Sequence, residues 1–158
     1  MNHKTAPVEI RERLALACDD PSRAITTLRS LPHLREVLYL ATCNRVEVLA
    51  EMEDEARGLE GIKAFIFSHG NLPGEELESC LYIYRGDTAT RHLFRVASSL
   101  DSMVMGEPQI LGQVKEAYRM SVENGASGLM INKLLHHAFR VAKRVRTETA
   151  IAFNAVSV

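Results

Sequence analysis

Two neighbouring segments with the pattern of β-strands constrain the fold of this 158-residue chain more than any other feature. Residues 36–40 (EVLYL) form an apolar run typical of a buried strand, and residues 46–51 (VEVLAE) resemble a half-buried strand, with apolar side chains mostly alternating with acidic ones. Residues 42–45 (TCNR) lie between them. We therefore expect the second segment to pair with the first, with the TCNR residues at the end of a rigid strand.

Helical patterns account for most of the remaining chain, and strand patterns disappear after residue 86. Asp20 followed by Pro21 is typical of a helix start, because the Asp side chain caps free N–H groups and proline suits the first turn. The predicted helices cover residues 7–17, 21–31, 60–69, 88–103, 108–124 and 129–149, and a further strand is predicted over residues 81–84. The sequence thus predicts an α+β fold, with an α+β part over residues 1–86 and a helical part over residues 87–158.

Composition places the chain among globular proteins, with 46% hydrophobic and 25% charged residues. The longest apolar runs fall far short of the roughly 20 residues of a membrane helix, and the first seven residues lack the apolar core of a secretion signal. Cys18, Cys43 and Cys80 are an odd number without a C-x-x-C pair, which favours free thiols over disulfides or a zinc site. We expect a cytoplasmic protein without membrane contact and without a metal.

Charge is divided unevenly along the chain. Residues 1–84 contain nine Lys or Arg against fourteen Asp or Glu, whereas residues 85–158 contain ten against six. The last predicted helix is basic and could follow the phosphates of an RNA. The alternative is a solvated surface, because the apolar positions of this helix already explain its packing. Its cations are Lys133, Arg140, Lys143, Arg144 and Arg146.

Cys43 is a candidate nucleophile. It follows a predicted buried strand, where side chains are exposed on a rigid support, and it stands two residues from a guanidinium. The alternative is that Cys43 fills the end of the strand as a small apolar residue. Cys18 and Cys80 are interpreted in that structural way.

Two further regions contain groups suited to chemistry. His92 lies between two arginines in a predicted helix and is a candidate general base or hydrogen-bond partner, or else a half-exposed surface imidazole. Residues 101–113 bring a hydroxyl, a carboxylate and amides to a tight corner, as a site for a small polar ligand does. The alternative there is a capping turn with Met103 and Met105 in the core.

Four motifs, in order along the chain, resemble the glutamyl-tRNA reductase family. They are NHKTAPVE at 2–9, TCNRVE at 42–47, RHLFRVASSLDS at 91–102 and GEPQILGQVK at 106–115. The resemblance implies a ferredoxin-like β-α-β-β-α-β antiparallel sheet, followed by a helical segment that completes a glutamate pocket. The family usually has an apolar first strand before Asn2, and we expect the sheet of this chain to lack it.

The resemblance also implies an activity, the NADPH-dependent reduction of glutamyl-tRNA to glutamate-1-semialdehyde in tetrapyrrole (porphyrin) biosynthesis. Cys43 falls on the family's nucleophile, which holds the glutamyl group as a thioester, and His92 falls on its catalytic histidine. The positions that fall on substrate contacts are Thr42, Asn44, Arg45, Ser102, Glu107, Pro108, Gln109 and Gln113. From their charges, we expect Arg45 to pair with the substrate carboxylate and Glu107 with its α-amine.

The implied partners are glutamyl-tRNA, a second copy held through a C-terminal dimerisation domain, and the downstream aminomutase. We expect the NADPH-binding and dimerisation domains to be absent from this chain, which contains no G-x-G-x-x-G and ends where they should begin. The chain alone is then expected not to complete the reduction. Two alternatives remain open: a noncatalytic tRNA-binding module with an inert Cys43, and a cysteine-dependent thioester or ester hydrolase.

Overall fold

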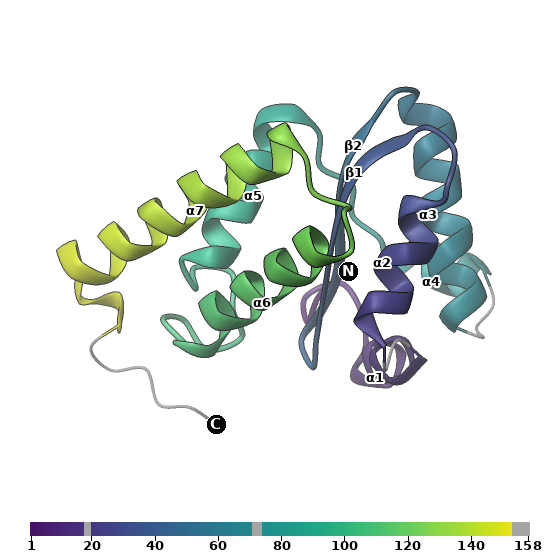
Figure 1. The fold of residues 1–158 in the computed structure, drawn as a ribbon. Helices are drawn as coiled ribbons and strands as arrows, with labels where there is room; N and C mark the ends of the chain where they lie inside the picture. Colours follow the sequence, from purple (N-terminus) through teal and green to yellow (C-terminus); the bar gives the residue numbers. More distant parts are fainter. Residues whose placement is uncertain (18–19, 71–73, 153–158) are drawn as a thin grey trace. The chain divides into compact units, whose positions relative to one another are not determined.

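The computed structural model describes residues 1–17, 20–70 and 74–152, and the chain divides into two compact units (Figure 1). Unit 1 comprises Met1–Tyr82 and Ala117–Ile131, and unit 2 comprises Ile83–Glu116 and Asn132–Val158. Each unit is described by itself below. No helix of the described residues is long and apolar enough to cross a membrane.

Unit 1 contains the predicted strand pair. Strand β1 (Leu34–Thr42) pairs antiparallel with β2 (Arg45–Met52), with Tyr39 opposite Val48. The middle of β1 is buried on both faces and most of β2 is half-buried, as their patterns predicted. The prediction of an α+β fold with an antiparallel sheet is confirmed. Beside β2, Asn2 forms an isolated antiparallel bridge with Arg45.

The strand predicted over residues 81–84 is wrong, because these residues belong to no strand of the structure. They follow a short helix, α4 (Gly74–Cys80), that the sequence analysis did not predict. Leu77 and Cys80 are three residues apart and bury one side of this helix. The N–H of Leu81 donates to the carbonyl oxygen of Glu78 at 3.2 Å, so the chain is still turning where the strand was expected to begin.

Three longer helices contact the sheet or one another in unit 1: α1 (Val8–Ala17), α2 (Pro21–Arg29) and α3 (Glu55–Gly70) (Figure 1). The predicted cap of α2 is confirmed, since the Asp20 carboxylate accepts from the N–H of Arg23 at 3.1 Å. Helix α3 begins five residues earlier than predicted, because the Asp54 carboxylate accepts from the N–H of Arg57 at 3.1 Å and caps it. The buried core of this unit includes Ile25, Leu28, Val37, Tyr39, Phe65 and Leu77.

The connection between α6 (Gln109–Glu123) and α7 (Leu129–Glu148) covers the edge of β1. The N–H of Val37 donates to the carbonyl oxygen of Ala126 at 2.8 Å, and the Ser121 hydroxyl donates to the carbonyl oxygen of Val37 at 2.5 Å. The Glu36 carboxylate accepts from the N–H groups of Met130 at 3.0 Å and Ile131 at 2.7 Å, at the start of α7. Backbone groups that an edge strand leaves open are therefore satisfied within unit 1.

Unit 2 consists of α5 (Gly86–Ala97), the loop that follows it, the first half of α6, most of α7 and a short 3₁₀ turn (Ala150–Ala152). The helical character predicted after residue 86 is confirmed. Helix α5, however, ends six residues before the predicted end. Ser99 takes a left-handed conformation with φ 61°, and the N–H of Leu100 donates back to the carbonyl oxygen of Arg95 at 2.8 Å, a pattern that ends helices.

Candidate active site

Cys43 and Asn44 form the two-residue connection between β1 and β2, and the Cys43 side chain is exposed. Two-residue hairpin turns commonly need positive φ angles, but neither of these residues has one. Instead, the hydroxyl oxygen of Thr42 accepts from the N–H groups of Asn44 and Arg45, both at 3.1 Å. A local side-chain hydrogen bond thus fixes the backbone that carries the thiol.

Arg11, in α1, forms hydrogen bonds with the same turn. Its Nη1 atom donates to the carbonyl oxygen of Cys43 at 2.7 Å and to the side-chain oxygen of Asn44 at 3.0 Å, and its Nε atom donates to the carbonyl oxygen of Ala6 at 3.2 Å. The residue is only 5% exposed. The sequence analysis missed Arg11; the available signal was its position three residues before Leu14, which places both residues on the same side of the helix.

Arg45 lies beneath the turn rather than on its surface. It is 1% exposed, and its Nη1 atom is 2.7 Å from a carboxylate oxygen of Glu47. The Tyr82 hydroxyl donates to the same carboxylate. Arg45 is therefore covered and already paired with a carboxylate, and its predicted contact with the substrate stays a prediction.

His92 lies in the middle of α5 and is half-buried. Its ring centroid is 4.8 Å from that of Tyr84, and the two planes are tilted by 37°. The contact limits the rotation of the imidazole from one side. The predicted catalytic role of His92 stays a prediction.

The loop between α5 and α6 is closed by Ser99. Its hydroxyl donates to the carbonyl oxygen of Glu107 at 2.6 Å, and its carbonyl oxygen accepts from the N–H of Gly106 at 3.0 Å. Ser99 is 1% exposed. Sequence reasoning missed this role, because a Ser-Ser pair inside a helical pattern gives no signal for a left-handed residue.

Two features of the structure require glycine at position 106, at the end of this loop. Its φ is +86°, and a Cβ atom built there would lie 2.1 Å from the carbonyl oxygen of Ile151. Between the closing residues, Met103 and Met105 are 58% and 63% exposed. The alternative that placed these two methionines in the core is wrong.

The predicted substrate contacts of unit 2 follow one another along this loop and into α6. Ser102, Glu107 and Pro108 lie in the loop, Gln109 begins α6, and Gln113 follows one turn later. Among the described residues, the buried hydroxyl of Ser102 has no hydrogen-bond partner. Buried polar atoms nearly always have a partner, so this hydroxyl is available to a ligand.

The structure thus divides the predicted site residues between its units. Unit 1 brings Thr42, Cys43, Asn44 and Arg45 together at one turn, and unit 2 carries His92 and the residues of the α5–α6 loop and the start of α6. Cys80 is 4% exposed in the core of unit 1, in agreement with a structural role, whereas Cys18 lies outside the described residues. Within the described ranges, no three His, Cys, Asp or Glu residues gather as a metal site would require.

These features define a class of protein, an α+β domain that presents an exposed thiol on a hairpin turn fixed by buried hydrogen bonds. The sequence matches the family described as "Glutamyl-tRNAGlu reductase, N-terminal domain" over residues 1–149. The chain belongs to this family.

Individual proteins similar to this chain carry the name of the same family. The chain is 60% identical to a protein named glutamyl-tRNA reductase from Syntrophus aciditrophicus, over all of this chain and 38% of that protein. It is 53% identical to one from Geotalea uraniireducens, over all of this chain and 36% of that protein. The solved glutamyl-tRNA reductase from Methanopyrus kandleri superposes with a TM-score of 0.77 at 34% identity, over 99% of this chain and 35% of that structure. The chain therefore spans little more than a third of the length of these relatives.

Proposed function

We propose that this chain is the catalytic part of a glutamyl-tRNA reductase, in which Cys43 accepts the glutamyl group of glutamyl-tRNA as a thioester. In the whole protein, NADPH would reduce this group to glutamate-1-semialdehyde for tetrapyrrole biosynthesis. The observation that carries the proposal is the exposed Cys43 thiol on a backbone held by Thr42 and Arg11.

The step proposed for this chain is an acyl transfer. The sulfur of Cys43 forms a bond to the carbonyl carbon of the aminoacyl ester, the bond from that carbon to the ribose oxygen breaks, and the thiol proton passes to the ribose oxygen. His92 is the proposed carrier of that proton. The products are free tRNA and a thioester, which is a better electrophile than the oxygen ester.

Binding of the glutamyl group is proposed for the remaining site residues. Arg45 would hold its side-chain carboxylate, with Glu47 on the same guanidinium, and Glu107 would hold its α-amine. The Glu107 side chain makes no hydrogen bond or ion pair within the described part of the chain, and the buried Ser102 hydroxyl lacks a partner there. Thr42 and Asn44 would act by shaping the turn, and Pro108, Gln109 and Gln113 by contacting the glutamyl group.

NADPH does not fit the residues of this chain. Dinucleotides bind to parallel sheets at a glycine-rich turn, whereas the sheet here is an antiparallel pair and the sequence contains no G-x-G-x-x-G. We therefore assign no residue of this chain to NADPH. The dimerisation and aminomutase contacts likewise belong to the proposal for the whole protein.

Intact-protein mass spectrometry tests the proposal. The chain is incubated with glutamyl-tRNA, quenched in mild acid and compared with Cys43→Ser. We expect a mass increase of one glutamyl residue on the wild type only, removed by neutral hydroxylamine as a thioester is. Wild type that binds tRNA without an adduct would instead support the noncatalytic module, and steady multiple-turnover release of glutamate without NADPH would support the hydrolase.

A further inference from the structure

A groove of about 410 Å³ lies within unit 2, apart from the residues assigned above to the glutamyl group. One side of α5 lines it, together with Leu100 and with Val141 and Val145 of α7. Phe94 of α5 is the aromatic residue among the lining side chains. These four apolar residues are half-buried, so the groove offers apolar walls that are open to a ligand.

A buried hydroxyl without a partner belongs to the lining of this groove. Ser98 is 2% exposed, and its Oγ atom has no hydrogen-bond partner among the described residues. Such groups are rare in folded proteins, because burying a hydroxyl unsatisfied is unfavourable. A polar atom of a bound molecule would satisfy it.

Two guanidinium groups also line the groove. Arg91 and Arg95 are exposed and lie four residues apart on α5, on the same side of the helix. Neither guanidinium forms a hydrogen bond or an ion pair within the described ranges of the chain. The pair therefore presents two positive charges that no ion pair holds among the described residues, and they match an anion with paired oxygens, such as a phosphate.

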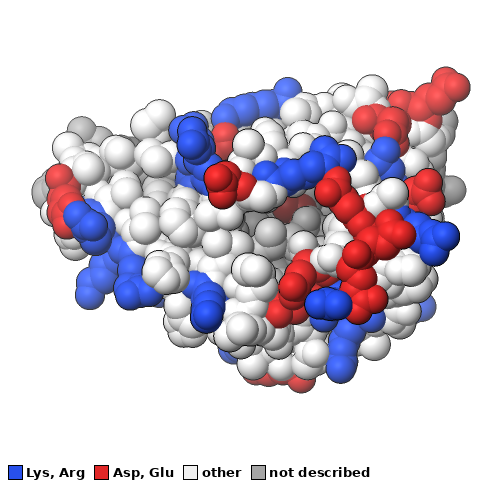
Figure 2. Space-filling model, turned by 90° about the horizontal axis from the view of Figure 1, so that it is seen from above, with Lys and Arg blue, Asp and Glu red and all other residues white. Residues whose placement is uncertain are grey.

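The surrounding charge favours a polyanion over an apolar peptide. Unit 2 carries nine Lys or Arg against five Asp or Glu. On the face drawn in Figure 2, most of the acidic side chains gather on the right of the view. Asp87 is the one acid in the lining, and a base amino group or a ribose hydroxyl could donate to it.

We propose that this groove binds an unpaired nucleotide of the tRNA. Its phosphate lies against Arg91 and Arg95, its base against Phe94, and Ser98 bonds to a polar atom of the base or ribose. The proposal rests on the proposed function for the identity of the RNA. It does not use Cys43 or His92, so it can fail independently.

Binding of deacylated glutamate-accepting tRNA, measured by fluorescence anisotropy, tests the groove. We expect Arg91→Ala/Arg95→Ala to weaken binding about tenfold or more and to reduce the slope of log affinity against log salt by about 1.4. Phe94→Leu keeps an apolar wall but removes the aromatic face, and should weaken binding about fivefold or more. Thermal unfolding establishes that each variant is folded.

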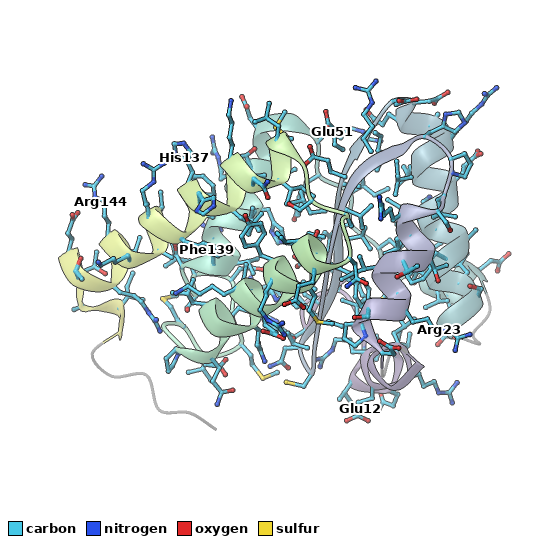
Figure 3. All side chains as sticks on the ribbon, in the orientation of Figure 1. Glu12, Arg23, Glu51, His137, Phe139 and Arg144 are labelled. Atoms are coloured by element: carbon cyan, nitrogen blue, oxygen red, sulfur yellow. The ribbon has the colours of Figure 1, made fainter. Side chains whose placement is uncertain are left out.

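The matched control is Arg140→Ala/Arg144→Ala, which removes the same charge from exposed positions of α7 outside the groove. Arg144 points outward near the end of α7 (Figure 3) and pairs with Glu148 at 3.0 Å. We expect this variant to weaken binding less than about threefold. Equal losses in both double variants would overturn the proposal in favour of diffuse attraction, and a larger loss in the control would place the RNA on the exposed face of α7.

Adduct formation on Cys43 separates this proposal from the proposed function. One outcome is that the wild type forms the thioester while Arg91→Ala/Arg95→Ala reaches half-saturation at the same tRNA concentration as the wild type. In that case the groove proposal is wrong and the proposed function stands. If RNA binding depends on the groove but no thioester forms, the groove proposal stands and the catalytic function fails. If substitution of Arg91, Arg95 and Phe94 leaves tight RNA binding unchanged, the proposal is wrong, and an apolar peptide becomes the better candidate ligand for the groove.

Discussion

The guanidinium of Arg11 donates a hydrogen bond to the carbonyl oxygen of Cys43 at 2.7 Å, between residues 32 positions apart in the sequence. The same nitrogen reaches the side chain of Asn44, and Nε reaches Ala6. A planar, forked donor can hold three acceptors at once, whereas an ammonium group holds its acceptors from a single point. The placement of the exposed thiol therefore depends on a buried side chain that has no direct part in the proposed chemistry.

Arg11→Lys keeps the charge and removes the fork. We expect the rate of thioester formation on Cys43 to fall about 10- to 100-fold, because a displaced nucleophile loses its alignment with the ester. The tRNA concentration at half-saturation should change little, which separates positioning from substrate binding. Quenched-flow mass spectrometry measures both, with the exposed Arg13→Lys on the same helix as the control. An unchanged rate in Arg11→Lys would show that Thr42 alone fixes the turn.

The hairpin that carries Cys43 could be predicted because its signals are local. The apolar run of β1 and the alternating pattern of β2 each indicate which of their residues are buried, and the two residues between the strands leave little choice of pairing. Asp20 and Pro21 start α2 for the same local reason. Family motifs then singled out Cys43 as the candidate nucleophile.

The supports of the site could not be predicted, because they depend on distant contacts. Arg11 acts on a turn that only the folded chain brings near, and Ser99 closes a loop with an atom eight residues away. The early end of α5 could not be predicted either. The left-handed residue that ends this helix is Ser99, whereas the usual sequence signal for such an end is glycine. Residues 81–84 have the strand pattern but pair with no strand in the part of the chain that the structure describes, so the pattern alone was misleading.

Gly106→Ala should distort the α5–α6 loop. The added Cβ would meet the carbonyl oxygen of Ile151 at 2.1 Å, and the φ of +86° is unfavourable for any L side chain. We expect the free energy of unfolding, measured in urea, to fall by about 2 kcal/mol or more. Gly112→Ala is the control, because nothing lies within 4 Å of that Cβ and alanine favours a helix by about 1 kcal/mol. Equal stability of the two variants would contradict the close contact.

Ser99 offers a test of backbone strain. Ser99→Ala loses the hydrogen bond to Glu107 and keeps a Cβ atom at φ 61°, and should cost about 1–3 kcal/mol. Ser99→Gly loses the same bond but relieves the left-handed conformation, so it should be more stable than Ser99→Ala by about 1 kcal/mol. Urea unfolding of the two variants measures the difference. The strain argument fails if the alanine variant is the more stable one.

Glu36 links β1 to the start of α7 within unit 1. Burial by itself raises the pKa of this carboxyl, but the N–H groups of Ile131, Met130 and Gly128 and a hydrogen bond with Glu51 together lower the pKa below its ordinary value of about 4.5. A Cβ on Gly128 would lie 2.4 Å from the carboxylate, so the approach is close. A negative charge at a helix N-terminus is also favoured by the helix dipole.

Glu36→Gln should therefore remove stability in a pH-dependent way. A carboxyl whose pKa is lower in the folded state stabilises the fold above its unfolded pKa, and this contribution disappears as the pH falls through the folded value. Glutamine has one oxygen for two N–H donors, so we expect a loss of about 1–3 kcal/mol at pH 7. The difference from wild type should shrink steadily below about pH 4.5. Urea unfolding of both proteins from pH 7 down to the lowest pH at which they stay folded measures this difference in the free energy of unfolding. A difference that stays constant over that range would mean that the negative charge of Glu36 does not stabilise its contact with α7.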